Sequence, residues 1–215
     1  EGGRWVGRMD VFHGKAYRYE GGEEREVEVP EGERERAQSF RQQVLEAIGV
    51  KTRQVRKPEE LEGIDALIIP GGESTAIGKL LVDYGLLEPI RVMAERGLPI
   101  FGTCAGLILL AKDIAGSRQP RLGLMDMRVE RNAFGRQVES FEVDLGVPAL
   151  GEKPLRAVFI RAPYISAVGP GVEVLASLDD GKIVMARQGR FLGCAFHPEL
   201  TDDRRVHRYF LEHCS

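Results

Sequence analysis

Two short apolar segments, each followed at once by small residues, limit most strongly what this chain can fold into. Residues 65–70 read DALIIP and run into a Gly-Gly pair, and residues 98–103 read LPIFGT and run into Cys-Ala-Gly. Uninterrupted apolar runs of this length are typical of parallel strands that are covered on both faces. From Ile77 to Tyr84, apolar residues follow the first run at helical spacing. The pattern predicts strand–turn–helix units around a mostly parallel sheet.

After residue 50 the chain alternates between strand-like and helix-like patterns, and after Gly123 it consists mainly of successive strand-like runs. We expect a strand at 50–55 and a buried helix at 104–116, which would end at Gly116. Strand-like runs separated by Gly, Pro and Asn follow at 125–132, 136–145, 156–163, 172–178 and 182–188, and a last buried strand at 191–198. The sequence therefore predicts a three-layer α/β fold: a mostly parallel sheet, helices on both faces and a small antiparallel part.

A closing helix is expected after residue 200. Thr201 would cap it, with Asp202 and Asp203 in the first turn, where negative charge suits the helix dipole. Residues at helical spacing would form its inward stripe: Val206, Tyr209, Phe210 and His213.

Charge dominates the first part of the chain. Between Glu20 and Arg36 there are eight Glu and three Arg, a run typical of a solvated loop or face. Apolar spacing predicts a first helix at 33–48, and the candidate for a first strand is MDVFHG at 9–14. We expect one domain over residues 1–215, in which residues 15–36 are a charged insertion or a divergent N-terminal segment.

Composition argues against several classes of protein. Lys and Arg number 30 and Asp and Glu 33, a net charge of -3, which does not suit binding of nucleic acid through a basic surface. The longest apolar stretch, residues 97–111, is short for a membrane span, which needs about 20 residues. Three cysteines in 215 residues do not form a disulfide framework. We expect a cytoplasmic protein without a membrane or nucleic-acid partner.

Cys104 is the strongest candidate for chemistry. It stands between a buried strand and a helix, in a turn where Gly102 and Gly106 permit a sharp elbow. A thiol at the positive end of a helix is favoured as the nucleophilic thiolate, and the amide of Ala105 would face a developing oxyanion. The alternative is a buried structural cysteine, which is common in protein cores.

A candidate base follows the last strand at His197-Pro198-Glu199. In an extended segment, residues two apart point the same way, so Glu199 could orient the imidazole of His197. The alternatives are a surface His-Pro turn with a solvated Glu, or a metal site formed by Cys194 and His197. Residues three apart in a strand face opposite sides, so we expect Cys194 to lie in the core, and we predict no metal.

The loop after the first buried strand, PGGEST at 70–75, is a candidate ligand loop. Its two glycines let backbone amides approach a ligand closely, and the start of a helix suits a carboxylate or phosphate. It is not a P-loop, because the spaced Gly-Lys-Ser/Thr is absent. An ordinary strand–helix turn remains the alternative.

Taken together, these motifs resemble one known family. The resemblance rests on GGEST (71–75), FGTCAGLILLAK (101–112), GLMDMRVERNAFGRQVESFE (123–142), FIRAP (159–163) and GCAFHPELTDD (193–203). They are similar to the glutaminase subunits of pyridoxal 5'-phosphate synthase, which are class I, triad-type glutamine amidotransferases with a flavodoxin-like fold. The similarity covers about residues 50–213.

The resemblance implies a set of roles. Cys104 would attack the side-chain amide of L-glutamine to form a γ-glutamyl thioester, with His197 as base and acid and Glu199 orienting it. The amides of Gly72 and Ala105 would bind the oxyanion. Substrate-binding positions would be Gly72, Glu73, Ser74, Arg131, Ile160 and Arg161; structural ion pairing is the alternative for the two arginines.

The resemblance also implies a partner. Ammonia would pass to a separate (β/α)₈-barrel synthase subunit in a large hetero-oligomer, and this subunit would need no cofactor. Two other functions stay open: the same chemistry serving an imidazole or purine synthase, and a non-catalytic glutamine-binding or docking subunit. The second is motivated by the N-terminus, where the family has a strand close to Gly-Val-Leu-Ala-Leu-Gln-Gly and this chain does not.

Overall fold

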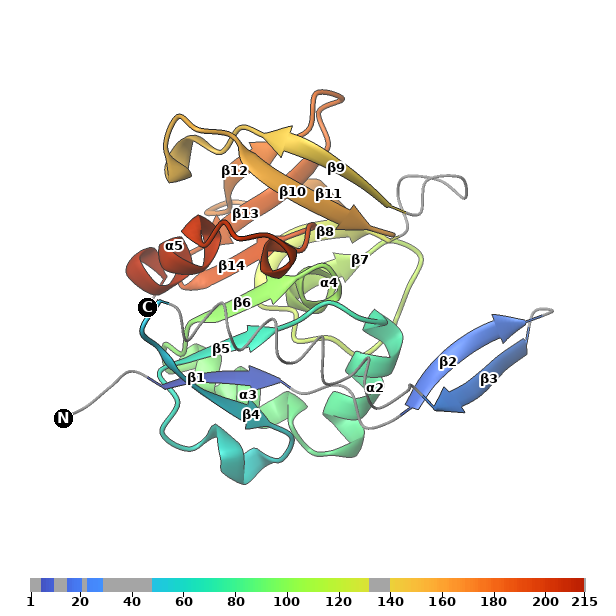
Figure 1. Ribbon diagram of the computed structural model, residues 1–215. Coiled ribbons are helices and arrows are strands. Elements are labelled where there is room, and N and C mark those ends of the chain that lie inside the picture. The colour runs from blue at the N-terminus through green and yellow to red at the C-terminus, as the bar shows by residue number, and fades with distance from the viewer. Residues whose placement is uncertain (1–4, 10–14, 21–22, 29–47, 132–139, 215) are drawn as a thin grey trace.

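The architecture is a doubly wound α/β sheet. The computed structural model describes residues 5–9, 15–20, 23–28, 48–131 and 140–214, and these residues form one ten-stranded sheet and two smaller ones (Figure 1). Five strands form the parallel part: β4 (Lys51–Val55), β1 (Trp5–Met9), β5 (Ala66–Ile69), β6 (Ile100–Thr103) and β14 (Phe191–Cys194). Their order in the sheet is β4-β1-β5-β6-β14. Numbered along the chain as five parallel strands, this is the 2-1-3-4-5 order of flavodoxin-like folds.

Beyond β14 the sheet continues with mostly antiparallel strands. These are β13 (Ile183–Gln188), β11 (Tyr164–Val168), β8 (Met125–Glu130) and β12 (Glu173–Ser177), whereas β7 (Ala111–Ile114) pairs with β8 in parallel. A separate antiparallel pair contains β9 (Ser140–Leu145) and β10 (Leu155–Ile160). The expected sheet with an added antiparallel part is confirmed.

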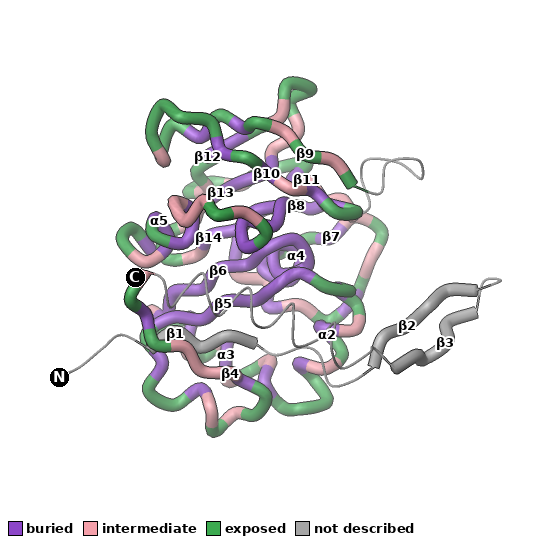
Figure 2. The backbone as a smooth tube through the Cα atoms, viewed as in Figure 1, coloured by how far each residue is buried: buried purple, intermediate pink, exposed green. Residues whose placement is uncertain are grey.

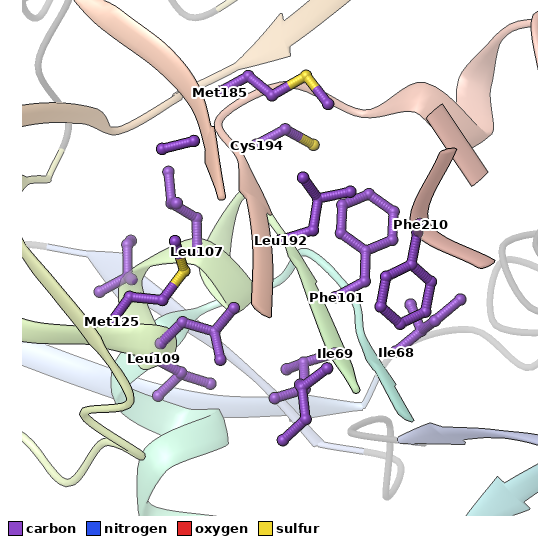
Figure 3. Packing of buried hydrophobic residues seen from close by; sticks show 14 of the residues in the cluster. Ile68, Ile69, Phe101, Leu107, Leu109, Met125, Met185, Leu192, Cys194 and Phe210 are labelled. Carbon is purple, nitrogen blue, oxygen red and sulfur yellow. The ribbon is translucent and has the colours of Figure 1, made fainter. Parts of the chain in front are cut away.

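Helices cover both faces of the sheet, as expected. In β6, the Phe101 ring packs on Phe210 of α5 (Arg205–His213), with centroids 5.4 Å apart. The next residue, Gly102, faces α4 (Ala105–Leu110), because a Cβ there would lie 2.4 Å from the Gly106 carbonyl carbon. Figure 3 shows Phe101 and Phe210 on one side of the strands and Leu107 on the other. The two-residue period of the strand thus separates the helical layers.

The remaining helical elements surround this centre. They are α2 (Ser74–Asp83), α3 (Leu87–Glu95) and the short 3₁₀ turns η1 (Pro58–Leu61), η2 (Pro148–Leu150) and η3 (Pro198–Leu200). Burial is greatest along β5, β6, β14 and α4 (Figure 2). In the described part of the chain, no helix has the length and apolar character that a membrane crossing requires.

The N-terminal segment differs from expectation in two places. The first strand lies at Trp5–Met9, so only Met9 of the expected 9–14 belongs to it, and β1 pairs in parallel with both β4 and β5. Part of the charged run, for which a solvated loop or face was expected, belongs to an antiparallel hairpin, β2 (Lys15–Glu20) and β3 (Glu23–Glu28). The expected helix at 33–48 lies outside the described residues, apart from its last residue, Ile48, in a turn.

Two helix boundaries also needed tertiary information. The helix expected at 104–116 ends at Leu110, because the Leu109 carbonyl accepts the amides of Leu122 and Gly123, and the next four residues become β7. The closing helix begins at Arg205, so the expected Thr201 cap is wrong: the Thr201 hydroxyl donates to the Pro198 carbonyl and accepts the amide of Asp203, which precedes the helix.

The acidic residues before this helix and its inward stripe also differ from expectation. Asp202 and Asp203 precede the helix, and the Asp203 carboxylate accepts the amide of Arg205. His213 is exposed, whereas His207 and Cys214 are buried with the rest of the stripe.

Candidate active site

Cys104 sits on a strained elbow between β6 and α4. Its φ of 50° and ψ of -101° are unusual for a residue with a side chain, and its amide donates to the Cys194 carbonyl at 2.8 Å. The elbow requires a glycine after it, because a Cβ at Gly106 would lie 2.1 Å from the Ile69 carbonyl oxygen. The thiol is almost buried, with 7% of the residue exposed. Strain held in place by packing of this kind is typical of nucleophile elbows.

His197 and Glu199 form a buried pair at the carboxyl end of β14. The Nδ1 of His197 lies 3.0 Å from the Oε1 of Glu199. The backbone amide of His197 donates to the Val158 carbonyl of β10 at 2.8 Å, so the small antiparallel sheet helps to hold the histidine. The two residues are 8% and 4% exposed, which excludes the surface His-Pro turn as an interpretation.

The side chains of Cys104 and His197 both pack against Gly71. A Cβ at Gly71 would lie 2.4 Å from His197 Cε1 and 3.3 Å from Cys104 Cβ, so both side chains close over this glycine. Burial lowers the pKa of His197, but its hydrogen bonds with Cys104 and Glu199 outweigh burial and raise the pKa to about 9. The structure therefore brings the three expected triad residues into one hydrogen-bonded group.

The Ile160-Arg161 segment lies beside the thiol of Cys104. The Sγ of Cys104 lies 3.9 Å from the Ile160 carbonyl oxygen, within reach of a weak S–H hydrogen bond. Arg161 has a left-handed φ of 42°, rare for a residue with a side chain, where the chain turns at the end of β10. This expected substrate segment is therefore next to the nucleophile.

The residues of the GGEST loop, 71–75, have different positions relative to the active site. Gly71 was missed as a site residue, although the Gly-Gly pair after a buried strand was the signal for it. Gly72 has a φ of 150° and is exposed. The Glu73 side chain caps α2 by accepting the amide of Thr75 at 3.0 Å, and Ser74 is buried at the start of that helix.

Arg131 has a different partner from the one expected. Its Nη1 donates to the Oε1 of Gln119 at 2.8 Å, at the end of β8. This hydrogen bond ties Arg131 to the chain between β7 and β8. Residues 132–139, which hold most of the RNAFGRQ motif, lie outside the described residues.

Cys194 is a core residue, as expected. It is fully buried, its Sγ donates to the Phe196 carbonyl at 3.4 Å, and burial raises the pKa of its thiol well above the usual value. In the described ranges, no three His, Cys, Asp or Glu side chains are grouped as metal ligands.

A flavodoxin-type sheet with an elbow cysteine and a His–Glu pair at the carboxyl ends of adjacent strands defines the class of triad glutamine amidotransferases. Comparison with known proteins agrees with this class. The chain belongs to the SNO glutamine amidotransferase family, whose model matches residues 36–215.

Individual relatives and solved structures are similar to this chain over most of its length. A Pelotomaculum thermopropionicum protein named pyridoxal 5'-phosphate synthase subunit PdxT is 69% identical over 173 residues, 80% of this chain and 88% of that protein. The protein of the same name from Moorella thermoacetica is 64% identical over 176 residues, 81% of this chain and 93% of its own. A crystal structure of a glutamine amidotransferase superimposes with a TM-score of 0.77 at 54% identity, covering 82% of this chain and 93% of that one. PurLQS from Thermotoga maritima, at 18% identity and a TM-score of 0.68, shares the fold.

Proposed function

We propose that this protein is the glutaminase subunit of a pyridoxal 5'-phosphate synthase. It hydrolyses L-glutamine to L-glutamate and ammonia and delivers the ammonia to a synthase subunit. The observation that carries the proposal is the buried contact of Cys104, His197 and Glu199 at the ends of β6 and β14. The names of relatives up to 69% identical support the pathway.

The first half of the reaction breaks the amide. The Sγ of Cys104 attacks the side-chain carbonyl carbon of glutamine, and a C–S bond forms while the Cys104 proton passes to His197. Backbone amides of Gly72 and Ala105 bind the resulting oxyanion. His197 then gives its proton to the amide nitrogen, the C–N bond breaks, and ammonia leaves the γ-glutamyl thioester. The raised pKa of His197 suits this step, because it favours the imidazolium that Glu199 stabilises.

The second half releases glutamate. Water attacks the thioester carbon while His197 accepts a proton from it, the C–S bond breaks, and the proton returns to Cys104. The Nδ1 contact with Glu199 at 3.0 Å keeps the other ring nitrogen of His197 directed at these atoms in both halves.

The substrate would be held by the segments that border Cys104. We assign this role to Gly72, Glu73, Ser74, Ile160 and Arg161, and support comes from the position of Gly71 and Ile160 against the nucleophile. Arg131 would bind the substrate carboxylate after exchanging its hydrogen bond with Gln119.

The partner we propose is a (β/α)₈-barrel synthase subunit in a large hetero-oligomer, located in the cytoplasm. The three cysteines are free and buried, which suits a reducing compartment. We also propose that residues 1–215 act as one domain, because β1 pairs with β4 and β5 of the main sheet. An imidazole or purine pathway has less support, since the putative GMP synthase subunit and PurLQS, at 17% and 18% identity, share only the fold.

Glutamine hydrolysis tests the proposal directly. Ammonia release is measured for the full chain alone and with a barrel subunit of pyridoxal 5'-phosphate synthase, with Cys104→Ala as the control. We expect release that rises with the barrel and is absent in the variant. Hydrolysis that persists in Cys104→Ala would overturn the triad, and release indifferent to the barrel would overturn the pathway.

A further inference from the structure

Two buried polar side chains on the α5 side of the sheet have no part in the reaction described above. Thr103, the last residue of β6, is 2% exposed, and His207 of α5 is 4% exposed. Within the described part of the chain, neither the Oγ1 of Thr103 nor the Nδ1 of His207 has a hydrogen-bond partner. Buried polar atoms are nearly always paired, so two such atoms in one region require an explanation.

Strand register and electrostatics relate both side chains to Glu199. Thr103 follows Phe101 by two residues on β6, so both face α5, and the Phe101 ring stands 5.8 Å from the ring of His207. Thr103 is also the register partner of Cys194 in β14. The charge of Glu199 acts on both Cys194 and His207. Figure 3 shows Phe101 packed on Phe210 of α5 on this side of the sheet.

His207 is uncharged in this position. Burial lowers the pKa of His207 to about 4, and the opposing effect of the Glu199 charge is smaller. A neutral imidazole has one N–H donor, and the hydroxyl of Thr103 has another. Two neutral donors therefore stand in the region of a buried carboxylate, a group that accepts several hydrogen bonds.

We propose that Thr103 and His207 are positioning residues for Glu199. Both donate a hydrogen bond to one shared buried water, and this water donates the hydrogen bond that holds the Glu199 carboxylate toward His197. Such a water makes about three hydrogen bonds to otherwise unsatisfied polar groups, which matches Thr103 Oγ1, His207 Nδ1 and the carboxylate. The inference rests on the proposed role of Glu199 in the triad, and it assigns the Nδ1–H tautomer to His207.

Other titratable groups lie on the elements that meet here. Cys194 and His197 belong to β14 and the turn after it, Cys104 lies between β6 and α4, and Arg204 stands at the start of α5. Of these, His197 has the 3.0 Å contact with Glu199. A carboxylate that is less firmly held should therefore change the pKa of His197 before that of the other groups.

The test uses the full chain with its synthase subunit. Thr103→Val and His207→Phe remove the donors with little change in volume, and Thr103→Ser and His207→Asn keep them. We expect the first two to lower kcat for glutamine hydrolysis on the order of ten-fold with KM unchanged, and to move the His197 limb of the pH–rate profile to lower pH. The donor-keeping variants should recover most of both.

Two controls separate the explanations. Phe210→Leu loosens packing on the same Phe101 ring without removing a polar group, so it should lower the melting temperature and leave the pH profile in place. Loss of activity in Glu199→Gln with wild-type kcat and pH profile in Thr103→Val and His207→Phe would overturn this inference alone. Normal turnover in Glu199→Gln would overturn the triad, and this inference with it.

A measurement on the unmodified protein completes the test, whether or not a variant folds. The ¹⁵N chemical shifts of His207 distinguish the two neutral tautomers. A protonated Nδ1 supports the inference, and a protonated Nε2 contradicts it.

Discussion

Replacing Gly71 by alanine should disable the site while leaving the fold intact. The new Cβ would lie 2.4 Å from His197 Cε1, where ordinary contacts begin at 3.4 Å, so the imidazole must retreat by about 1 Å. Misplacing a reacting group by about 1 Å costs on the order of 100-fold in rate, or about 3 kcal/mol of transition-state stabilisation. Gly71 does not have a positive φ, so alanine causes no backbone strain there.

The assay is steady-state glutamine hydrolysis with the synthase subunit present, together with a thermal melt. We expect kcat to fall about 100-fold with little change in melting temperature. Gly146→Ala is the matched control, because a Cβ there meets nothing within 4 Å and its φ is not positive. A Gly71→Ala protein that turns over glutamine at the rate of Gly146→Ala would refute the argument that this glycine sets the position of His197.

Three further predictions address the elbow and the two buried histidines. Gly106→Ala should prevent folding, since its Cβ would lie 2.1 Å from the Ile69 backbone oxygen; expression as a stable protein with normal circular dichroism would contradict this. Glu199→Gln should lower the pKa of His197 from about 9 and reduce kcat at least on the order of 100-fold, as measured from pH–rate profiles. A profile whose His197 limb stays at the wild-type pH would contradict the proposed interaction between Glu199 and His197. His207 takes up a proton in the unfolded chain below about pH 6.5 but in the fold only near pH 4, so it should destabilise the protein progressively between these values, by at most about 3 kcal/mol. Urea unfolding against pH should show this acid loss in the wild type and less of it in His207→Phe.

Much of the fold followed from local patterns. The apolar runs that became β5, β6 and β14 were recognisable because a buried parallel strand has no polar side to interrupt it. Most strands of the second half were also found, since alternation and Gly or Pro breaks are local signals, but β7 and β11 were not expected. The helix α3 was not identified, and its outward-facing apolar Val92 shows why its pattern was weak.

Helix ends were less predictable, because several backbone and side-chain hydrogen bonds compete to determine them. The end of α4 depends on amides of Leu122 and Gly123 that bind the Leu109 carbonyl. The Thr201 hydroxyl accepts the amide of Asp203, which precedes the helix, and the Asp203 carboxylate accepts the amide of Arg205, so α5 begins later than the Thr201 cap suggested. A hydrogen bond between distant segments decided the end of α4, and competing local hydrogen bonds decided the start of α5.

The sequence by itself determined the elbow: a strand, a cysteine flanked by glycines and a helix leave few other conformations, because only small residues fit where Gly102 and Gly106 pack. The pairing of His197 with Glu199 was also expected, but for a reason that does not hold: β14 ends at Cys194 and Glu199 lies in the 3₁₀ turn η3, so the turn and not a strand brings the two side chains together. Only the tertiary structure decided that these parts meet. The parallel pairing of β6 with β14 brings Cys104 and His197 to one edge of the sheet, and β10 fixes the histidine through the Val158 carbonyl. That proximity comes from strand pairing across distant parts of the chain, which no local pattern contains.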